Sequence, residues 1–167
     1  MKVLILIATL VASTFATLTA DEANLVKSTW SQVKDKEDEI LYDIFKQNPD
    51  IQGRFPMFVG KNLDSIKSTE QFKTHADKIV KAIGSYIDLL GNESNSGAIK
   101  TILNELGQRH RDRGASKEQF NEFKTSVLKY VKEHASGWND ASGSAWDKAF
   151  DDMYKIVFSN LDGNPVH

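Results

Sequence analysis

The sequence predicts an all-α protein. Apolar residues recur at intervals of three and four along most of the chain, which is the repeat of one helix face. Three stretches, beginning at Thr19, Ser68 and Ser116, have the pattern of a capping box, in which a hydroxyl and a Glu or Gln side chain satisfy the first free N–H groups of a helix. No run alternates apolar and polar residues as a half-buried strand would. We expect about seven to eight helices of unequal length that pack pairwise, ridges into grooves.

The first twenty residues, MKVLILIATLVASTFATLTA, have the pattern of a secretory signal peptide. Lys2 supplies a short positive region, residues 3–11 are apolar, and small residues follow. Thr14 and Ala16 fit a small-x-small cleavage rule, and Ala20 is a second candidate site. We therefore expect a signal peptide at 1–16, with cleavage as late as residue 20 as the alternative, and one domain at 17–167. A membrane anchor is the other interpretation, but the run is short for a membrane span.

Composition narrows the function classes. The chain has 167 residues, which favours one domain, and its net charge of −2 does not indicate binding to nucleic acid or to an anionic membrane. It contains no cysteine, so the core or a bound cofactor must supply the stability that disulfides give many small secreted proteins.

The first half predicts three helices and a loop. The Thr19 cap opens the first helix, and a second is expected over 38–47. Asn48-Pro49 ends the second helix and starts a short third one over 49–55, because proline disfavours helix in the residue before it but suits a first turn. The segment 56–67 has no clear period and is expected to be a loop.

The second half predicts long helices separated by short polar segments. One helix runs from the Ser68 cap to about Leu90, and the segment 91–97, GNESNSG, is expected to be a loop that contains the N-glycosylation sequon Asn92-Glu93-Ser94. The next helix ends at Gly114, and another follows the Ser116 cap. The segment 137–144 is expected to be a turn, and the last helix follows it.

Histidines are the residues that could carry chemistry. His134 lies near a helix end and His167 is the last residue, so both are expected to be solvated. His75 and His110 lie on apolar stripes, where a lone histidine is most often a satisfied core residue. No cluster predicts a zinc site, a nucleophilic triad or a phosphate loop. Two imidazoles in an apolar, cysteine-free helical core suit haem, whose iron needs one strong axial nitrogen ligand.

Three stretches then resemble the globin family: NPDIQGRFPMF (48–58), FKTHADKIV (72–80) and LNELGQRHRDRG (103–114). Within that family, ILYDIFKQNPDI (40–51), residues 58–80 and Ala145-Trp146 are similar to the extracellular haemoglobins of midge larvae. The resemblance implies a globin fold that encloses a haem pocket. His75 and His110 are 35 residues apart, several more than is usual in the family, and we expect the excess to lie in 91–97.

The resemblance also implies roles for the site residues. His110 would be the proximal ligand of the iron of haem b, and His75 would be the distal histidine, which donates to bound O2; alternatively, His75 swings out or binds the iron itself. The other implied cofactor contacts are an aromatic residue packed on the porphyrin and a second one three residues later, an aliphatic residue one turn beyond His75, three apolar residues of the pocket wall, and two cations for the haem propionates: Phe55, Phe58, Ile79, Leu106, Phe120, Phe123, Lys78 and Arg113.

The implied function is an extracellular haemoglobin of the haemolymph that binds O2 reversibly for transport or storage. CO and NO would be further ligands, nucleic acid and membrane would not be partners after signal cleavage, and the protein would be a monomer or a homodimer. No catalytic residue is expected. The alternatives are a haem-dependent peroxidase or nitric-oxide dioxygenase, and a haem-free helical carrier.

Overall fold

The computed structural model describes residues 18–166, and within them it is helical without strands. The all-α prediction is confirmed. The predicted signal peptide, residues 1–16, and His167 lie outside the described residues. The elements in chain order are α1 (Ala20–Ser31), α2 (Glu37–Gln47), α3 (Pro49–Gly53), α4 (Leu63–Ile66), α5 (Glu70–Leu89), the 3₁₀ turn η1 (Glu93–Asn95), α6 (Ser96–Arg111), α7 (Lys117–His134) and α8 (Asp140–Leu161).

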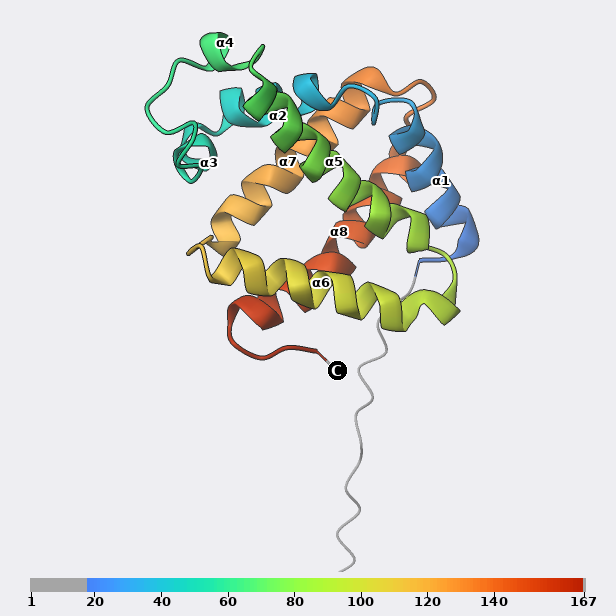
Figure 1. Ribbon diagram of the computed structural model, residues 1–167. Coiled ribbons are helices and arrows are strands. Elements are labelled where there is room, and N and C mark those ends of the chain that lie inside the picture. The colour runs from blue at the N-terminus through green and yellow to red at the C-terminus, as the bar shows by residue number, and fades with distance from the viewer. Residues whose placement is uncertain (1–17, 167) are drawn as a thin grey trace, which may run out of the picture.

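The long helices cross one another around one core (Figure 1). Helix α8 packs along both α6 and α1, and α2 packs against α5 and α7. Five large aromatic side chains are almost completely buried between these helices and set the spacing of the core: Phe45, Phe58, Phe72, Trp146 and Phe150. Helices α5 and α6 are joined at one edge of the molecule and diverge from there (Figure 1).

Capping explains where three helices begin. Thr19 and Glu22 form the predicted capping box of α1, and Ser116 and Gln119 form that of α7. At α5 the prediction is wrong by one residue, because Thr69 rather than Ser68 caps the helix. Its hydroxyl accepts from the backbone N–H of Phe72 at 3.3 Å.

Three expected loops contain more helix than the sequence predicts. Helix α4 lies inside the segment 56–67, and η1 with the first residues of α6 lies inside 91–97. Helix α8 begins at Asp140, inside the expected turn, because the Asn139 side chain accepts from the N–H of Ser142 at 3.0 Å. Ser142 is 1% exposed, so a small residue that suits a turn here packs in the core.

A buried amide holds the loop that follows α3. The Nε2 group of Gln52 donates to the carbonyl oxygens of Phe58 and Lys61, each at 2.9 Å. These bonds fold residues 53–61 back on α3, with the rings of Phe55 and Phe58 5.2 and 5.9 Å from the ring of Phe45. Both phenylalanines are thereby fixed beside the first half of α5.

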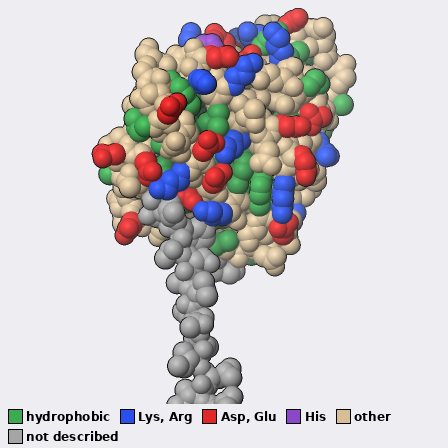
Figure 2. Space-filling model, turned by 180° about the vertical axis from the view of Figure 1, so that it is seen from behind, with side chains coloured by type: hydrophobic (Ala, Val, Ile, Leu, Met, Phe, Trp, Pro, Cys, Tyr) green, Lys and Arg blue, Asp and Glu red, His purple; other side chains and the backbone are tan. Residues whose placement is uncertain are grey.

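Polar contacts fix α1 to the rest of the fold. Trp146 Nε1 donates to Thr29 Oγ1 at 2.9 Å in the core, and Lys148 pairs with Glu22 at 2.9 Å nearer the surface. On the face that Figure 2 shows, acidic and basic side chains are interspersed rather than gathered in a patch of one sign. Among the described helices none is both long enough and apolar enough to cross a membrane.

Candidate functional site

His75 lies in the second turn of α5, among the aromatic rings of the loop after α3. Its imidazole is 4.5 Å from the ring of Phe55, at an interplanar angle of 74°, and 6.0 Å from the ring of Phe58. The edge-to-face arrangement holds the imidazole between helix and loop. The bonds from Gln52 therefore determine indirectly how His75 is oriented.

His110 lies in the last turn of α6. Its Nδ1 is 2.8 Å from the carbonyl oxygen of Leu106, one turn earlier in the same helix. A carbonyl can only accept, so Nδ1 carries the proton in the neutral ring and Nε2 keeps its lone pair. The ring of Phe120, 5.1 Å away, packs against the imidazole, and the hydroxyl of Tyr154 donates to the carbonyl of Phe120. His110 thus presents one oriented nitrogen that can bind a metal ion.

Burial favours the neutral form of both imidazoles. Burial, with the positive charges of Lys78 and Arg113, holds the pKa of His75 below its ordinary value. Burial also lowers the pKa of His110; the hydrogen bond to the Leu106 carbonyl opposes this shift, and the charges of Arg113 and Arg109 add to it. Neutral histidine is the form that binds metals.

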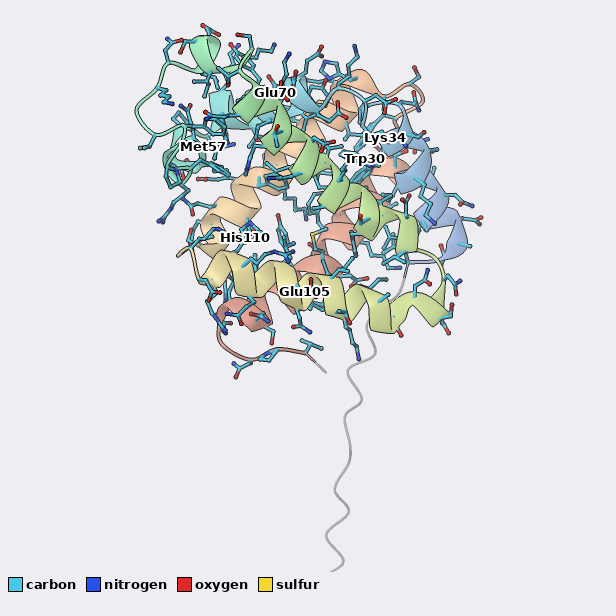
Figure 3. The ribbon with its side chains drawn as sticks, viewed as in Figure 1. Trp30, Lys34, Met57, Glu70, Glu105 and His110 are labelled. Carbon is cyan, nitrogen blue, oxygen red and sulfur yellow. The ribbon has the colours of Figure 1, made fainter. Side chains whose placement is uncertain are left out.

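The apolar side chains around the two histidines are only partly covered by protein. Five of the predicted cofactor contacts pack against the core and yet remain partly exposed: Phe55, Ile79, Leu106, Phe120 and Phe123. Phe58, by contrast, is 1% exposed. Figure 3 shows His110 on the side of α6 that faces α5 and α7. Partly exposed apolar walls, a neutral imidazole with a free Nε2 and a second imidazole fit haem, which is planar, largely apolar and bound through one axial nitrogen.

The volumes of the surface hollows alone would place the binding site away from the histidines. A hollow of about 190 Å³ adjoins His75 and is also lined by Met57 and Lys78. A larger hollow, about 360 Å³, lies between the start of α1, the connection from α5 to α6, and α8. No histidine lines the larger hollow, so we assign the site by its chemistry rather than by its volume.

The two predicted propionate partners differ in position. Lys78 is exposed and lines the hollow beside His75. Arg113 is also exposed, and its Nη1 donates to the carbonyl of Arg109 at 2.7 Å. The positive charge of Arg113 lies close enough to both His75 and His110 to lower the pKa of each.

The structure adds one feature that the sequence analysis missed. Met57 is 43% exposed beside His75, and Figure 3 places it on the same side of the molecule as His110. The proximal role implied that the other ring nitrogen of His110 donates to a backbone carbonyl or hydroxyl nearby, and the structure identifies this partner as the carbonyl of Leu106. His134 is exposed at the end of α7, where its ring stacks on Tyr130 with 4.1 Å between ring centres.

Two partly buried histidines, set among partly exposed apolar side chains of an all-helical fold, define the candidate site of a helical haem protein. Known proteins agree: the family model described as Globin matches residues 38–157. Globin CTT-II beta of Chironomus thummi thummi is 44% identical over 161 residues, covering 96% of this chain and 100% of the relative. Globin CTT-Z of Chironomus thummi piger is 50% identical over 141 residues, covering 84% and 86%.

The structural comparison gives the same answer. A haemoglobin component (TA-VII) from Tokunagayusurika akamusi superposes with a TM-score of 0.86 at 41% identity, covering 88% of this chain and 98% of that one. A Drosophila melanogaster globin gives a TM-score of 0.77 at 27% identity, covering 89% of this chain and 100% of that one. The chain belongs to the globin family. It is a haem-binding oxygen carrier of the haemoglobin kind rather than an enzyme, and the enzymatic and haem-free alternatives are not favoured.

Proposed function

We propose that this protein binds haem b between α5 and α6 and carries O2 reversibly in an extracellular fluid, the haemolymph. The single observation that carries the proposal is the hydrogen bond from Nδ1 of His110 to the Leu106 carbonyl, which leaves the lone pair of Nε2 to bind a metal ion. When bound, haem supplies a ferrous iron that takes a diatomic gas, so CO and NO are further ligands.

His110 is the proximal ligand in this proposal. The Leu106 carbonyl keeps the Nδ1 proton in place and the ring of Phe120 limits its rotation, so Nε2 is aimed before the cofactor binds. His75 donates a hydrogen bond from its ring N–H to O2. We propose that Phe55, Phe58, Ile79, Leu106, Phe120 and Phe123 exclude water from the cofactor, and that Lys78 and Arg113 pair with its propionates.

The proximal role is tested by His110→Gly. We expect the purified ferrous variant to lose the absorption spectrum of histidine-ligated haem, and added free imidazole to restore it by occupying the space of the side chain. His134→Gly, which removes an exposed histidine, is the control. An H110G spectrum unchanged from wild type would refute the assignment.

The distal role is tested by His75→Leu. A hydrogen bond to a charged or polarised acceptor contributes about 1.5–3 kcal/mol, which corresponds to roughly a 10- to 150-fold faster release of O2. CO is a much weaker acceptor, so its release should change far less. Equal effects on the two gases would show that His75 acts through the volume of the pocket and not through a hydrogen bond.

Secretion is the second part of the proposal. We propose that residues 1–16 are a signal peptide and that cleavage follows Ala16 rather than Ala20. Leu18 is 6% exposed, and Thr19 accepts from the N–H of Glu22 at 3.2 Å in the capping box of α1. Cleavage after Ala20 would remove both from the folded domain. N-terminal sequencing of the protein secreted by insect cells distinguishes the two cleavage sites.

The oligomeric state is a separate question. Sedimentation of the same sample distinguishes the monomer from the homodimer.

A further inference from the structure

The connection between α5 and α6 contains a motif that oxygen binding does not use. Asn92-Glu93-Ser94 is the one place in the sequence where an asparagine is followed, two residues later, by serine or threonine without an intervening proline. This motif is the acceptor for N-linked oligosaccharides in secreted chains. A motif of three residues also occurs by chance, so its geometry in the folded protein decides whether a glycan fits.

The two polar atoms of the Asn92 side chain are used differently. Oδ1 accepts from the backbone N–H of Ser94 at 3.0 Å and from the Ser94 hydroxyl at 2.8 Å, which starts η1. Among residues 18–166, Nδ2 donates no hydrogen bond that the structure shows. The side chain is exposed. A sugar on Nδ2 would therefore leave both bonds to Oδ1 intact.

Asn95, three residues later, shows the opposite arrangement. Its Nδ2 donates to the carbonyl of Leu89 at 3.0 Å and closes the end of α5. It is followed by Ser96-Gly97, so it lacks the motif as well. Of these two neighbouring asparagines, the one with the acceptor motif is also the one whose amide nitrogen the fold does not use.

The surface beside Asn92 has room for a bulky substituent. Asn92 and Glu93 border the hollow of about 360 Å³ that Leu18 and Ile99 also line. In Figure 1 this connection lies at the end of α6 that begins the helix, whereas His110 lies in the last turn of α6. A glycan at this position would not cover the opening beside His75.

We propose that Asn92 is an N-glycosylation site, an inference that rests on the proposed secretion of the chain. The donor is a lipid-linked oligosaccharide pyrophosphate of the secretory pathway. Its C1–O bond breaks with the electron pair going to the pyrophosphate, the Nδ2–C1 bond forms, and Nδ2 loses one proton. The product keeps one N–H and the carbonyl oxygen of the side chain.

The test expresses the full chain in insect cells and compares intact masses before and after digestion with peptide N-glycosidase. We expect the secreted wild type to carry a hexose and N-acetylhexosamine mass that the glycosidase removes while converting Asn92 to aspartate. Asn92→Gln and Ser94→Ala should lose this mass. Ser94→Thr, which keeps a hydroxyl, and Asn95→Gln, which changes the neighbouring asparagine, should retain it.

A second version of the chain, in which a strong insect secretion signal replaces residues 1–16, separates failure of secretion from failure of glycosylation. If only this version is secreted and it carries the glycan, the Asn92 proposal is supported and secretion by the native leader is refuted. If either version is secreted with the bare polypeptide mass, the Asn92 proposal is overturned and the oxygen-binding site is unaffected.

Discussion

Replacing Gly107 by alanine tests how closely α6 must approach α8. Gly107 is buried in α6, three residues before His110. A Cβ atom at this position would lie 2.7 Å from Cβ of Asn160 and 3.0 Å from the carbonyl oxygen of Val157, both on α8. The glycine is required by the approach of two backbones and not by an unusual turn.

The magnitude follows from ordinary contact distances. Non-bonded carbon atoms settle about 3.5–4.0 Å apart, so α6 must move away from α8 by about 1 Å. Overpacking of this kind costs roughly 1–3 kcal/mol, and alanine returns about 0.5–1 kcal/mol as the better helix former. From these two effects we expect Gly107→Ala to lower the free energy of unfolding by about 1 kcal/mol and to displace His110, which lies almost one turn further along the same helix.

The assay is urea unfolding of the haem-free protein, followed by the rate at which the loaded protein loses haem to an acceptor. Gly97→Ala is the matched control, because it lies in the first turn of the same helix and a Cβ atom added there would have nothing within 4 Å. We expect G97A to be neutral or slightly stabilising and to release haem at the wild-type rate. If G107A is as stable as G97A, the close approach of α6 to α8 is not what requires glycine.

Three other predictions concern single contacts. Thr19→Ala should cost about 0.5–2 kcal/mol by removing the cap of α1, which urea unfolding measures, and a cost near zero would contradict the capping role. Hydrogen bonds from the Lys148 side chain and from the backbone N–H of Thr19 lower the pKa of Glu22 from 4.5, so its contribution to stability is present above pH 4.5 and lost as the pH falls through the folded pKa. Glu22→Gln should therefore weaken the dependence of the unfolding free energy on pH in that range. A pH dependence unchanged from wild type would refute this role of Glu22. Tyr154→Phe removes a second donor from the carbonyl of Phe120, which keeps its helical bond from the Lys124 N–H, and should cost about 0.5–1.5 kcal/mol; a fully stable variant would show that this bond contributes nothing to stability.

The sequence predicted the features that depend on local patterns. The helical class, the capping boxes at Thr19 and Ser116, and the end of α2 before Pro49 follow from residues close together in the chain. The histidines could be singled out because each lies on an apolar stripe, although the periodicity alone could not say that either one binds a cofactor. The likeness to known sequences supplied that step.

Features that depend on distant contacts were missed. Residues 140–144 were expected to form a turn because they are small and polar, yet Ser142 and Gly143 belong to α8 and pack in or near the core. Met57 was not predicted to border the site, because nothing in a loop sequence shows which helix it will face. The segment 91–97, where the excess length between the histidines is expected, was predicted to be a loop but contains η1 and the first residues of α6.

Gln52 has a consequence for how this protein tolerates chemical change. Both hydrogens of its amide are committed to carbonyl oxygens, those of Phe58 and Lys61. Glutamate has nearly the same shape, but its carboxylate has no hydrogen to give at neutral pH and would face two oxygens instead. Spontaneous deamidation, or one base change in the codon, converts the first residue into the second. Either event would release the loop that holds Phe55 and Phe58 against His75, and the pocket would lose a wall whose own residues were unaltered.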